Sequence, residues 1–512
     1  MLKNRLVLIV LFLQFFHLYS QENTNLNIPK LTQTAFAEMS FLSVKMPSDE
    51  KNLSLAGMNF NLYLNKWAYA GLGMYGAVAG ERGGLFTLQA NAGIKKSLVA
   101  NIYLHTGLHF GGGGGANAPD GGGAYILAHL NLGYQFSRLS LETGYSYINF
   151  FDQGNIEGHQ LNVAIQVPFS YNYASFTHAE KELIINENIT DSDWYQTSKQ
   201  LSFLFHLNNL YLLADQDDIE ESLKGETIRT AGVELDSYFK KNTFLFIKAD
   251  GAYHGIQAGY MDIVSGLGHQ LVFNAQRTRI LGKLGIGAAG GGGVDTQGGF
   301  VIYPDISLEH KIFNHTFLSF DTGLLMSPNA RFAAWSYGLG LKQHIHLNAL
   351  VSSDGKAFSS AKFRGMEVIA GQEIYFDADR YYEDTENLQQ LFVQLNFYLS
   401  KNMYVSGQTS FANFGNAGAY AEGIVGGGIT TSSGFSNRIR LFAQILTGAA
   451  GGGGVDTGQG LVVKPGIGAS LAFNDKLGIR TSFGQVKSIY GELNSTLINL
   501  GLNYRIAMLS AK

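Results

Sequence analysis

The chain contains no cysteine and only seven prolines among its 512 residues. Without cysteine there can be no disulfide framework, no thiolate metal site and no cysteine nucleophile. The scarcity of proline excludes a proline-rich disordered chain, and it excludes a collagen despite the 64 glycines. The chain therefore folds without covalent cross-links, and its glycines need another explanation.

Charged residues are also scarce. They make up 15% of the chain, where about 25% is usual for a soluble domain. The formal net charge is -4, and no basic stripe is present to neutralise phosphates, so nucleic acid is not expected as a partner. Beyond the N-terminus no run of about 18 apolar residues occurs, so no transmembrane helix is expected. This composition suits a chain whose apolar residues face something other than water.

The N-terminus has the pattern of a secretory signal peptide. Lys3 and Arg5 precede an apolar run over residues 6–16, and Ser20 stands just before a polar stretch. The run is shorter than the about 20 residues that span a bilayer. We predict a signal peptide over residues 1–20, which directs the chain out of the cytoplasm. Without a cysteine after the run, a lipoprotein anchor is excluded.

Three glycine clusters indicate an internal repeat. They occupy residues 107–123, 287–299 and 448–460, and the last two share the run Gly-Ala-Ala-Gly-Gly-Gly-Gly-Val-Asp-Thr. Flanking segments match in pattern as well. We predict three repeats, at residues 30–176, 196–346 and 363–512, joined by linkers at 177–195 and 347–362.

Each repeat alternates apolar and polar residues with a period of two, which predicts about eight strands per repeat. Near the C-terminus, Ile498, Leu500 and Leu502 share one face, and Asn499 and Asn503 share the other. A soluble sandwich would bury the apolar face, whereas a membrane barrel turns it towards lipid. The polar face is rich in Gly, Ser, Asn and Gln, which suits a confined interior. The 35 Phe and 26 Tyr can supply the aromatic girdles of a membrane barrel.

The connections between predicted strands alternate in length. Tight connections include residues 65–66, 240–242 and 400–402, and long ones include 215–226, 377–387 and 485–494. Short turns at one end and long loops at the other are typical of outer-membrane barrels. In these patterns the chain resembles the outer-membrane β-barrel proteins of Gram-negative bacteria. The resemblance implies an all-β transmembrane antiparallel barrel in the bacterial outer membrane, with membrane lipid as a partner.

Three repeats of eight strands can form one barrel of 24 strands or three barrels of eight. A wide lumen would face water and need a charged wall, whereas small barrels fill their interiors with side chains. The predicted inward face is short of charge and rich in glycine, and the linkers are longer than the tight turns. These features favour three small barrels and leave the single large barrel as the alternative.

The glycine clusters fall between the fifth and sixth strands of each repeat, at the long-loop end. A run of glycines bends sharply and lets another backbone or a flat ligand approach closely. We therefore select them as candidate binding residues, against the simpler interpretation of flexible hairpin tips. The candidates are Gly111, Gly112, Gly113, Gly290, Gly291, Asp295, Gly451, Gly452 and Asp456.

The first repeat holds a candidate chemical site. His105, His109, His129 and Glu142 all lie on the predicted inward face, where imidazoles and a carboxylate could bind zinc or hydrolyse lipid. The matching positions in the other repeats differ. His105 is matched by Lys283 and Gln444, His129 by Asp305 and Gly466, and Glu142 by Asp321 and Arg480. This variation favours interior ion pairs, such as Lys283 with Asp305 and Asp321 or one involving Arg440, over catalysis or a metal.

Two loops are acidic, at residues 215–221 and 377–384. Either could bind a cation such as calcium, but a solvated surface is the simpler interpretation. We expect no cofactor and no enzymatic activity. The favoured function is a structural or surface-interaction role, through the outward loops and glycine hairpins, with a surface or periplasmic protein as partner. The alternatives are a passive pore for small solutes, which would need the single large barrel, and a lipid-modifying barrel enzyme.

Overall fold

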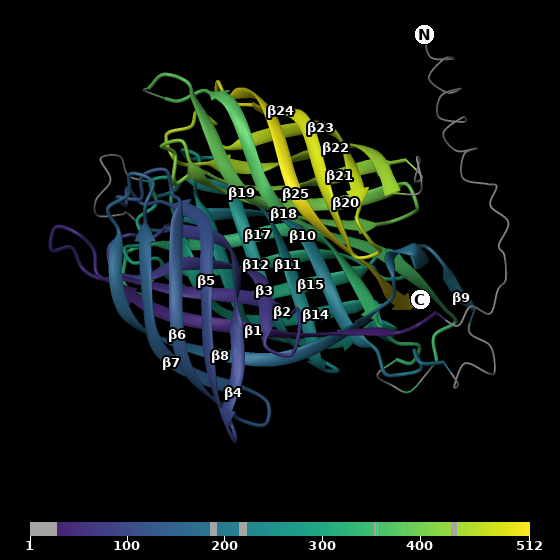
Figure 1. Ribbon diagram of the computed structural model, residues 1–512. Coiled ribbons are helices and arrows are strands. Elements are labelled where there is room, and N and C mark those ends of the chain that lie inside the picture. The colour runs from purple at the N-terminus through teal and green to yellow at the C-terminus, as the bar shows by residue number, and fades with distance from the viewer. Residues whose placement is uncertain are drawn as a thin grey trace, which may run out of the picture.

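A computed structural model describes residues 28–184, 192–214, 223–352, 355, 357–381, 383–431 and 438–511. The predicted signal peptide lies outside these residues. The fold is all-β, with strands β1 to β25 (Figure 1). Among the described residues, no helix has the length and apolar character needed to cross a membrane.

The first eight strands form a closed barrel, in which β1 pairs with β8 from Leu31 opposite Tyr173 to Leu42 opposite Asn162. Each strand also pairs antiparallel with the next, so a single ring of 24 strands is not what the chain forms. The strands are β1 (Leu31–Val44), β2 (Leu53–Tyr63), β3 (Ala68–Ala79), β4 (Phe86–Val99), β5 (Ile102–Gly114), β6 (Tyr125–Gln135), β7 (Ser140–Phe150) and β8 (Glu157–Tyr173).

In the second set of eight strands, the first strand β10 pairs with the last strand β17, from Lys199 opposite Leu347 to Leu212 opposite Ala334. The remaining strands pair in chain order. The strands are β10 (Lys199–Leu212), β11 (Thr227–Lys240), β12 (Thr243–His254), β13 (Met261–Phe273), β14 (Thr278–Gly290), β15 (Phe300–Lys311), β16 (Thr316–Met326) and β17 (Ala333–Leu347).

In the third set, β18 pairs with β25 from Ala361 opposite Ala511 to Phe376 opposite Thr496. The first and last strands of all three sets are thus hydrogen-bonded to each other. The strands are β18 (Ser360–Ala378), β19 (Glu386–Tyr398), β20 (Met403–Phe414), β21 (Ala421–Thr430), β22 (Ile439–Gly451), β23 (Leu461–Ala472), β24 (Leu477–Ser488) and β25 (Asn494–Ala511).

The segment between the first two sets is partly structured. A short 3-10 turn, η1 (Phe176–His178), is followed by β9 (Glu182–Ile184), which pairs with the start of β18. The sequence pattern predicts only a polar linker here. Trp194 is buried against Phe363 and donates a hydrogen bond from Nε1 to the carbonyl of Ile28 at 2.9 Å. The connecting segments are therefore packed together at the short-turn end.

The barrel wall is apolar outside and polar inside, as the alternation predicted. On β25, Leu500 and Leu502 are 52% and 67% exposed, whereas Asn499 and Asn503 are 6% and 1% exposed. An apolar surface of this extent is costly in water but stable against lipid. The wall therefore has the polarity of a barrel embedded in a membrane, and the sandwich alternative is wrong.

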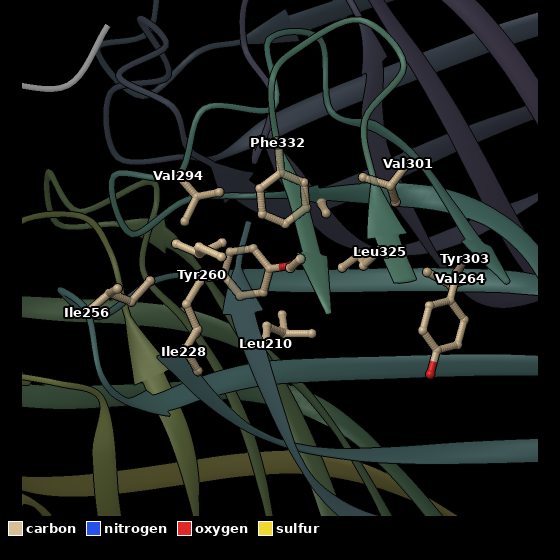
Figure 2. Close-up of a cluster of buried hydrophobic side chains, with 14 of the residues drawn as sticks. Leu210, Ile228, Ile256, Tyr260, Val264, Val294, Val301, Tyr303, Leu325 and Phe332 are labelled. Carbon is tan, nitrogen blue, oxygen red and sulfur yellow. The ribbon is translucent and has the colours of Figure 1, made fainter. Parts of the chain in front are cut away.

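A hydrophobic cluster fills each barrel at its long-loop end. In the second barrel, the side chains of Leu210, Ile228, Tyr260 and Phe332 gather inside the wall, all at most 2% exposed (Figure 2). The first and third barrels carry corresponding clusters around Tyr125 and Tyr420. Close packing of such clusters leaves little room for water.

Candidate functional sites: the glycine hairpins and the barrel interiors

The glycine hairpins connect β5 to β6, β14 to β15 and β22 to β23, at the end where the loops are long. Each one touches the neighbouring barrel. The hairpin of the second barrel packs on the first, that of the third packs on the second, and that of the first packs on the third. The three barrels therefore form a closed ring of head-to-tail contacts.

One backbone hydrogen bond recurs in all three contacts. The donor lies three residues after the glycine that opens the loop after the third strand of a barrel, which is Gly80, Gly255 or Gly415. The acceptor lies two residues before the last glycine of the neighbouring barrel's hairpin. The bonds run from the N–H of Gly83 to the carbonyl of Gln297 (2.5 Å), from Ala258 to Gly458 (3.2 Å) and from Gly418 to Gly121 (3.2 Å). The same local geometry thus joins each pair of barrels.

These contacts are too close for side chains. A Cβ on Gly84 would lie 2.4 Å from the nitrogen of Gly291, and Gly84 has a φ of +99°. A Cβ on Gly112 would lie 2.3 Å from the carbonyl oxygen of Ala412 in the third barrel. The glycines allow one backbone to lie directly on another.

The candidate binding residues lie in or beside these contacts. Asp295 and Asp456 turn their own hairpins, because their Oδ1 atoms accept hydrogen bonds from the N–H of Gln297 (2.7 Å) and Gly458 (3.2 Å). The sequence pattern did not indicate the loops that receive the hairpins. Their shared signal is a glycine followed three residues later by Gly or Ala, at 80–83, 255–258 and 415–418.

The first hairpin carries a buried carboxyl group that the other two hairpins lack. Asp120 stands where the others have Thr296 and Thr457, and its Oδ2 accepts a hydrogen bond from the N–H of Gly115 at 2.8 Å. Burial raises the pKa of Asp120 to about 7, although that hydrogen bond lowers it in part. Gly418 of the third barrel packs against this carboxylate, so an ionisable group lies within one of the three contacts.

The centre of the three-barrel ring is apolar. One buried cluster combines Phe86 and Leu88 of the first barrel, Ala288 of the second, and Leu391 and Phe411 of the third. All five are at most 7% exposed. Side chains from all three barrels therefore meet in one core.

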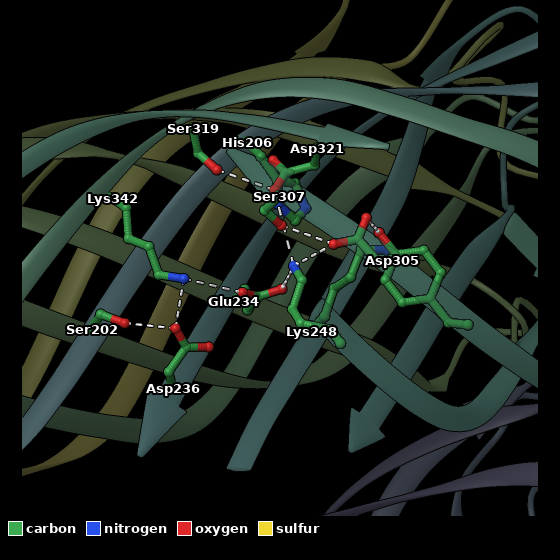
Figure 3. A network of polar contacts seen from close by, with 12 residues as sticks. Ser202, His206, Glu234, Asp236, Lys248, Asp305, Ser307, Ser319, Asp321 and Lys342 are labelled. Carbon is green, nitrogen blue, oxygen red and sulfur yellow. Dashed lines mark hydrogen bonds and ion pairs between the residues drawn. The ribbon is translucent and has the colours of Figure 1, made fainter. Parts of the chain in front are cut away.

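The interior of the second barrel carries many charges, so the prediction of a charge-poor interior is wrong for this barrel. Lys342 contacts Asp236 at 2.6 Å and lies 3.5 Å from Glu234 (Figure 3). It also contacts Glu309 at 2.9 Å. Ser202 donates a hydrogen bond to Asp236. Such charges can be buried because each has a partner of opposite sign, which the one-strand pattern does not reveal.

Lys283 occupies the middle of this barrel. It contacts Asp305 at 3.0 Å and Asp321 at 3.9 Å, which confirms the ion pairs predicted from the sequence. It also contacts Glu234 at 2.8 Å, a partner from β11 that the prediction missed. Lys248 forms a further pair of contacts, to Asp250 at 2.6 Å and Asp262 at 2.9 Å.

In the third barrel, Lys464 forms ion pairs with Glu373 and Glu422. Arg480 lies 3.7 Å from Glu367. The predicted cation Arg440 instead stacks on the ring of Phe176, at 5.1 Å, near the short-turn end. Its position close to the start of β22 places it away from the middle of the barrel.

The structure brings the four candidate residues of the first barrel together. The Nδ1 of His105 lies 2.8 Å from the Oε2 of Glu142, and the Nε2 of His109 lies 3.2 Å from the Nδ1 of His129. All four are at most 8% exposed. Glu38, which the sequence pattern did not indicate, lies beside them, with its Oε2 3.8 Å from the Nδ1 of His105. The barrel wall separates this cluster from the apolar outer surface.

Strand register corrects one predicted equivalence. Lys283 lies opposite Asp305 and Gln444 lies opposite Gly466, but His105 lies opposite Asn131. The three strands align at Gly114, Gly290 and Gly451, which lie opposite the residues six positions after Gly80, Gly255 and Gly415. Seven residues before them stand Gly107, Lys283 and Gln444, and Gly107 lies opposite His129. His129 is therefore the counterpart of Asp305 and Gly466, as predicted, whereas His105 is not the counterpart of Lys283. The predicted match for His105 was two residues out, although the three hairpins, at 114–123, 290–299 and 451–460, have equal length.

The described residues of the acidic loop at 377–384 form ion pairs and hydrogen bonds with the rest of the protein. Arg380 pairs with Glu383 at 3.1 Å and Glu386 at 3.0 Å, and it donates a hydrogen bond to the carbonyl of Gly453. Asp379 accepts a hydrogen bond from the N–H of Asn494. The other acidic loop, 215–221, lies outside the described residues.

Comparison with known proteins gives a likeness to outer-membrane β-barrel proteins. The siderophore receptor PirA from Pseudomonas aeruginosa is 10% identical, with 92% of this chain and 80% of that chain covered and a TM-score of 0.29. OccK11 (OpdR) from the same organism is 10% identical, with 93% of this chain and 96% of that chain covered and a TM-score of 0.20. OpdQ from Pseudomonas aeruginosa is 8% identical, with 93% of this chain and 98% of that chain covered and a TM-score of 0.22.

No family model and no curated protein matches the chain. TM-scores this low do not indicate a common overall architecture. The assignment as a membrane-type barrel therefore rests on the outward apolar wall and the strand pairing described above.

Proposed function

We propose that the protein is a three-barrel assembly of the bacterial outer membrane, built from three homologous eight-stranded repeats, with a structural and surface-interaction role. The glycine hairpins lock the barrels to one another, and the long loops face the exterior, where they are available to a protein partner. Outer-membrane lipid covers the apolar wall. The repeats correspond to residues 30–176, 196–346 and 363–512.

We call the three places where a glycine hairpin lies against the neighbouring barrel the seams. The observation that carries this proposal is that one backbone contact recurs at all three seams, and that the barrel interiors are filled. A chain selected mainly for transport would need a continuous water path. A chain selected for rigidity gains from interiors packed with side chains and from seams without side chains. The geometry favours the second design.

Orientation can be tested by cysteine labelling, because the native chain has no cysteine. We expect Asn117→Cys, in an exposed part of a long loop, to react with a membrane-impermeant maleimide in intact cells. Lys66→Cys, in an exposed short turn, should react only after the outer membrane is permeabilised. Labelling of Lys66→Cys alone in intact cells would overturn the proposed orientation.

A passive pore is the second candidate, and the interior of the second barrel favours it. Seven carboxylates there face three lysines, so a water path through this barrel would attract cations. This pore would run through one eight-stranded barrel. It would not need the single barrel of 24 strands that was the alternative prediction from the sequence.

Planar-bilayer recording separates the two functions. The structural proposal predicts no discrete conductance steps from the purified, folded protein. The pore predicts cation-selective steps that weaken in an Asp305→Asn, Asp321→Asn variant. Steps with that dependence would replace the structural proposal with transport.

A further inference from the structure

We propose that Glu38, His105 and Glu142 in the first barrel form a binding site for a divalent transition-metal cation such as Zn²⁺. The three side chains come from β1, β5 and β7 and converge inside the wall, all at most 5% exposed. One donor atom from each lies within 4.8 Å of the other two. Imidazole and carboxylate are both ordinary zinc ligands.

The spacing around His105 fits a small cation. Its Nδ1 lies 2.8 Å from Glu142 Oε2 and 3.8 Å from Glu38 Oε2. Tetrahedral bonds of about 2 Å place ligand atoms about 3.3 Å apart, which lies between these two distances. A cation between the three atoms therefore needs only small side-chain movements, and a fourth position is left for water.

A second layer of hydrogen bonds holds the donors in place. The Nε2 of His105 is 2.7 Å from the hydroxyl of Tyr69, which leaves Nδ1 as the atom that faces the carboxylates. Tyr103 donates to Glu142 Oε1 at 2.7 Å, and Gln166 donates to Glu38 Oε2 at 2.7 Å. Partners of this kind orient metal ligands and fix the imidazole tautomer.

The other two barrels show what is missing from this one. There, buried carboxylates meet an ammonium group, Lys283 in the second barrel and Lys464 in the third. In the first barrel, the strand register puts Gly107 at the position of Lys283 and Leu127 at that of Lys464. The nearby Lys95 hydrogen-bonds Gln166 and lies over the ring of Tyr103. Among the described residues, the ion pairs of Glu38 and Glu142 are with the imidazole of His105 and not with an ammonium group. A divalent cation would supply the charge that Lys283 and Lys464 supply in the other barrels.

Two neighbouring imidazoles also have spare donor atoms. His129 Nε2 and His109 Nδ1 are buried and have no hydrogen-bond partner among the described residues. The ring centre of His129 lies 4.6 Å from that of His105. An imidazole-rich surrounding favours Zn²⁺ over Ca²⁺ or Mg²⁺, which prefer oxygen ligands.

The test is Zn²⁺ binding by the full mature chain, purified in detergent and treated with a chelator. We expect about one Zn²⁺ per chain after gel filtration, measured by mass spectrometry of the metal, and retention against millimolar Mg²⁺. Glu142→Gln and His105→Ala should lose it. Tyr69→Phe, which keeps all three ligands, should weaken binding by about tenfold. His159→Ala, on the outer face of β8, is the matched control and should bind normally.

Heat-modifiable gel migration shows whether each variant is folded. If His105→Ala does not fold, Co²⁺ absorption of the native chain and of the near-isosteric Glu142→Gln decides the question. The native protein should then show visible bands that Glu142→Gln lacks. The proposal is overturned if the native chain takes up no Zn²⁺, or if folded Glu142→Gln binds it as the native chain does.

Discussion

At the scale of single residues, close contact decides where glycine is required. Gly84 sits against the hairpin of the second barrel with a φ of +99°, and a Cβ there would meet the backbone of Gly290 and Gly291. Gly282, by contrast, would carry a Cβ with nothing within 4 Å. The two positions separate glycine needed for a seam from glycine that merely lies in a strand.

We therefore expect Gly84→Ala to lower the free energy of unfolding by about 2 kcal/mol, because it combines an unfavourable φ with a backbone clash. Gly282→Ala should change it by less than about 0.5 kcal/mol. The measurement is urea unfolding in lipid vesicles followed by tryptophan fluorescence. Equal stability of the two variants would show that the seam at Gly84 is not formed.

Buried ion pairs are the second residue-scale feature. Lys283→Met should destabilise the protein by about 3–5 kcal/mol, because Glu234 and Asp305 would lose the cation that offsets their charge. Lys96→Met, at an exposed position of β4, should have little effect. The same unfolding assay compares them, and a stable Lys283→Met variant would mean that these carboxylates are solvated or protonated.

Asp120 makes one seam sensitive to pH. Its pKa is raised by burial to about 7, above the 3.8 of a free carboxyl group. Between these values the folded state holds a proton that the unfolded state has lost, so stability falls as pH rises from about 4 to about 7. Protease cleavage of the 116–123 hairpin should accelerate over this range. Asp120→Asn should remove the dependence, and a variant that keeps it would assign the effect to another group.

At the scale of elements, the alternation along each strand predicted which face is apolar, and the loop lengths predicted which end carries the long connections. Both signals are local in sequence. The seams were not predictable in this way, because Gly83 and Gln297 lie far apart in the chain and meet through backbone atoms alone. Glu234 was missed for a similar reason, since it reaches Lys283 across the barrel from β11.

The outward face of the strands gives a prediction of its own. Leu502 on β25 and Leu64 after β2 are almost equally exposed, at 67% and 69%. Leu502→Arg should cost about 2–4 kcal/mol if the side chain faces the middle of a bilayer, whereas Leu64→Arg, beside a short turn, should cost about 0–1 kcal/mol. Refolding into vesicles measures both, and equal costs would argue against a membrane around the wall.

At the scale of the whole molecule, three closed sets of strands are joined into a ring through their glycine hairpins. Each seam is head-to-tail, and three such contacts close without leaving a free end. The apolar cluster around Phe86, Ala288 and Phe411 fills the centre of the ring. Three barrels of one polypeptide thus form the kind of closed ring that a symmetric trimer forms from three separate copies.

Engineered disulfides across the seams test this arrangement most directly. Cβ atoms at Gly76 and Ala288 would lie 2.9 Å apart, and those at Gly251 and Ala449 2.8 Å apart, so small shifts reach the about 3.8 Å of a disulfide. We predict that Gly76→Cys/Ala288→Cys and Gly251→Cys/Ala449→Cys both cross-link in folded protein, seen as faster migration on non-reducing gels. The control Lys66→Cys/Ala288→Cys, with its cysteines at opposite ends of the barrels, should not. Failure of both seam pairs to cross-link in heat-modifiable protein would contradict the three-barrel ring.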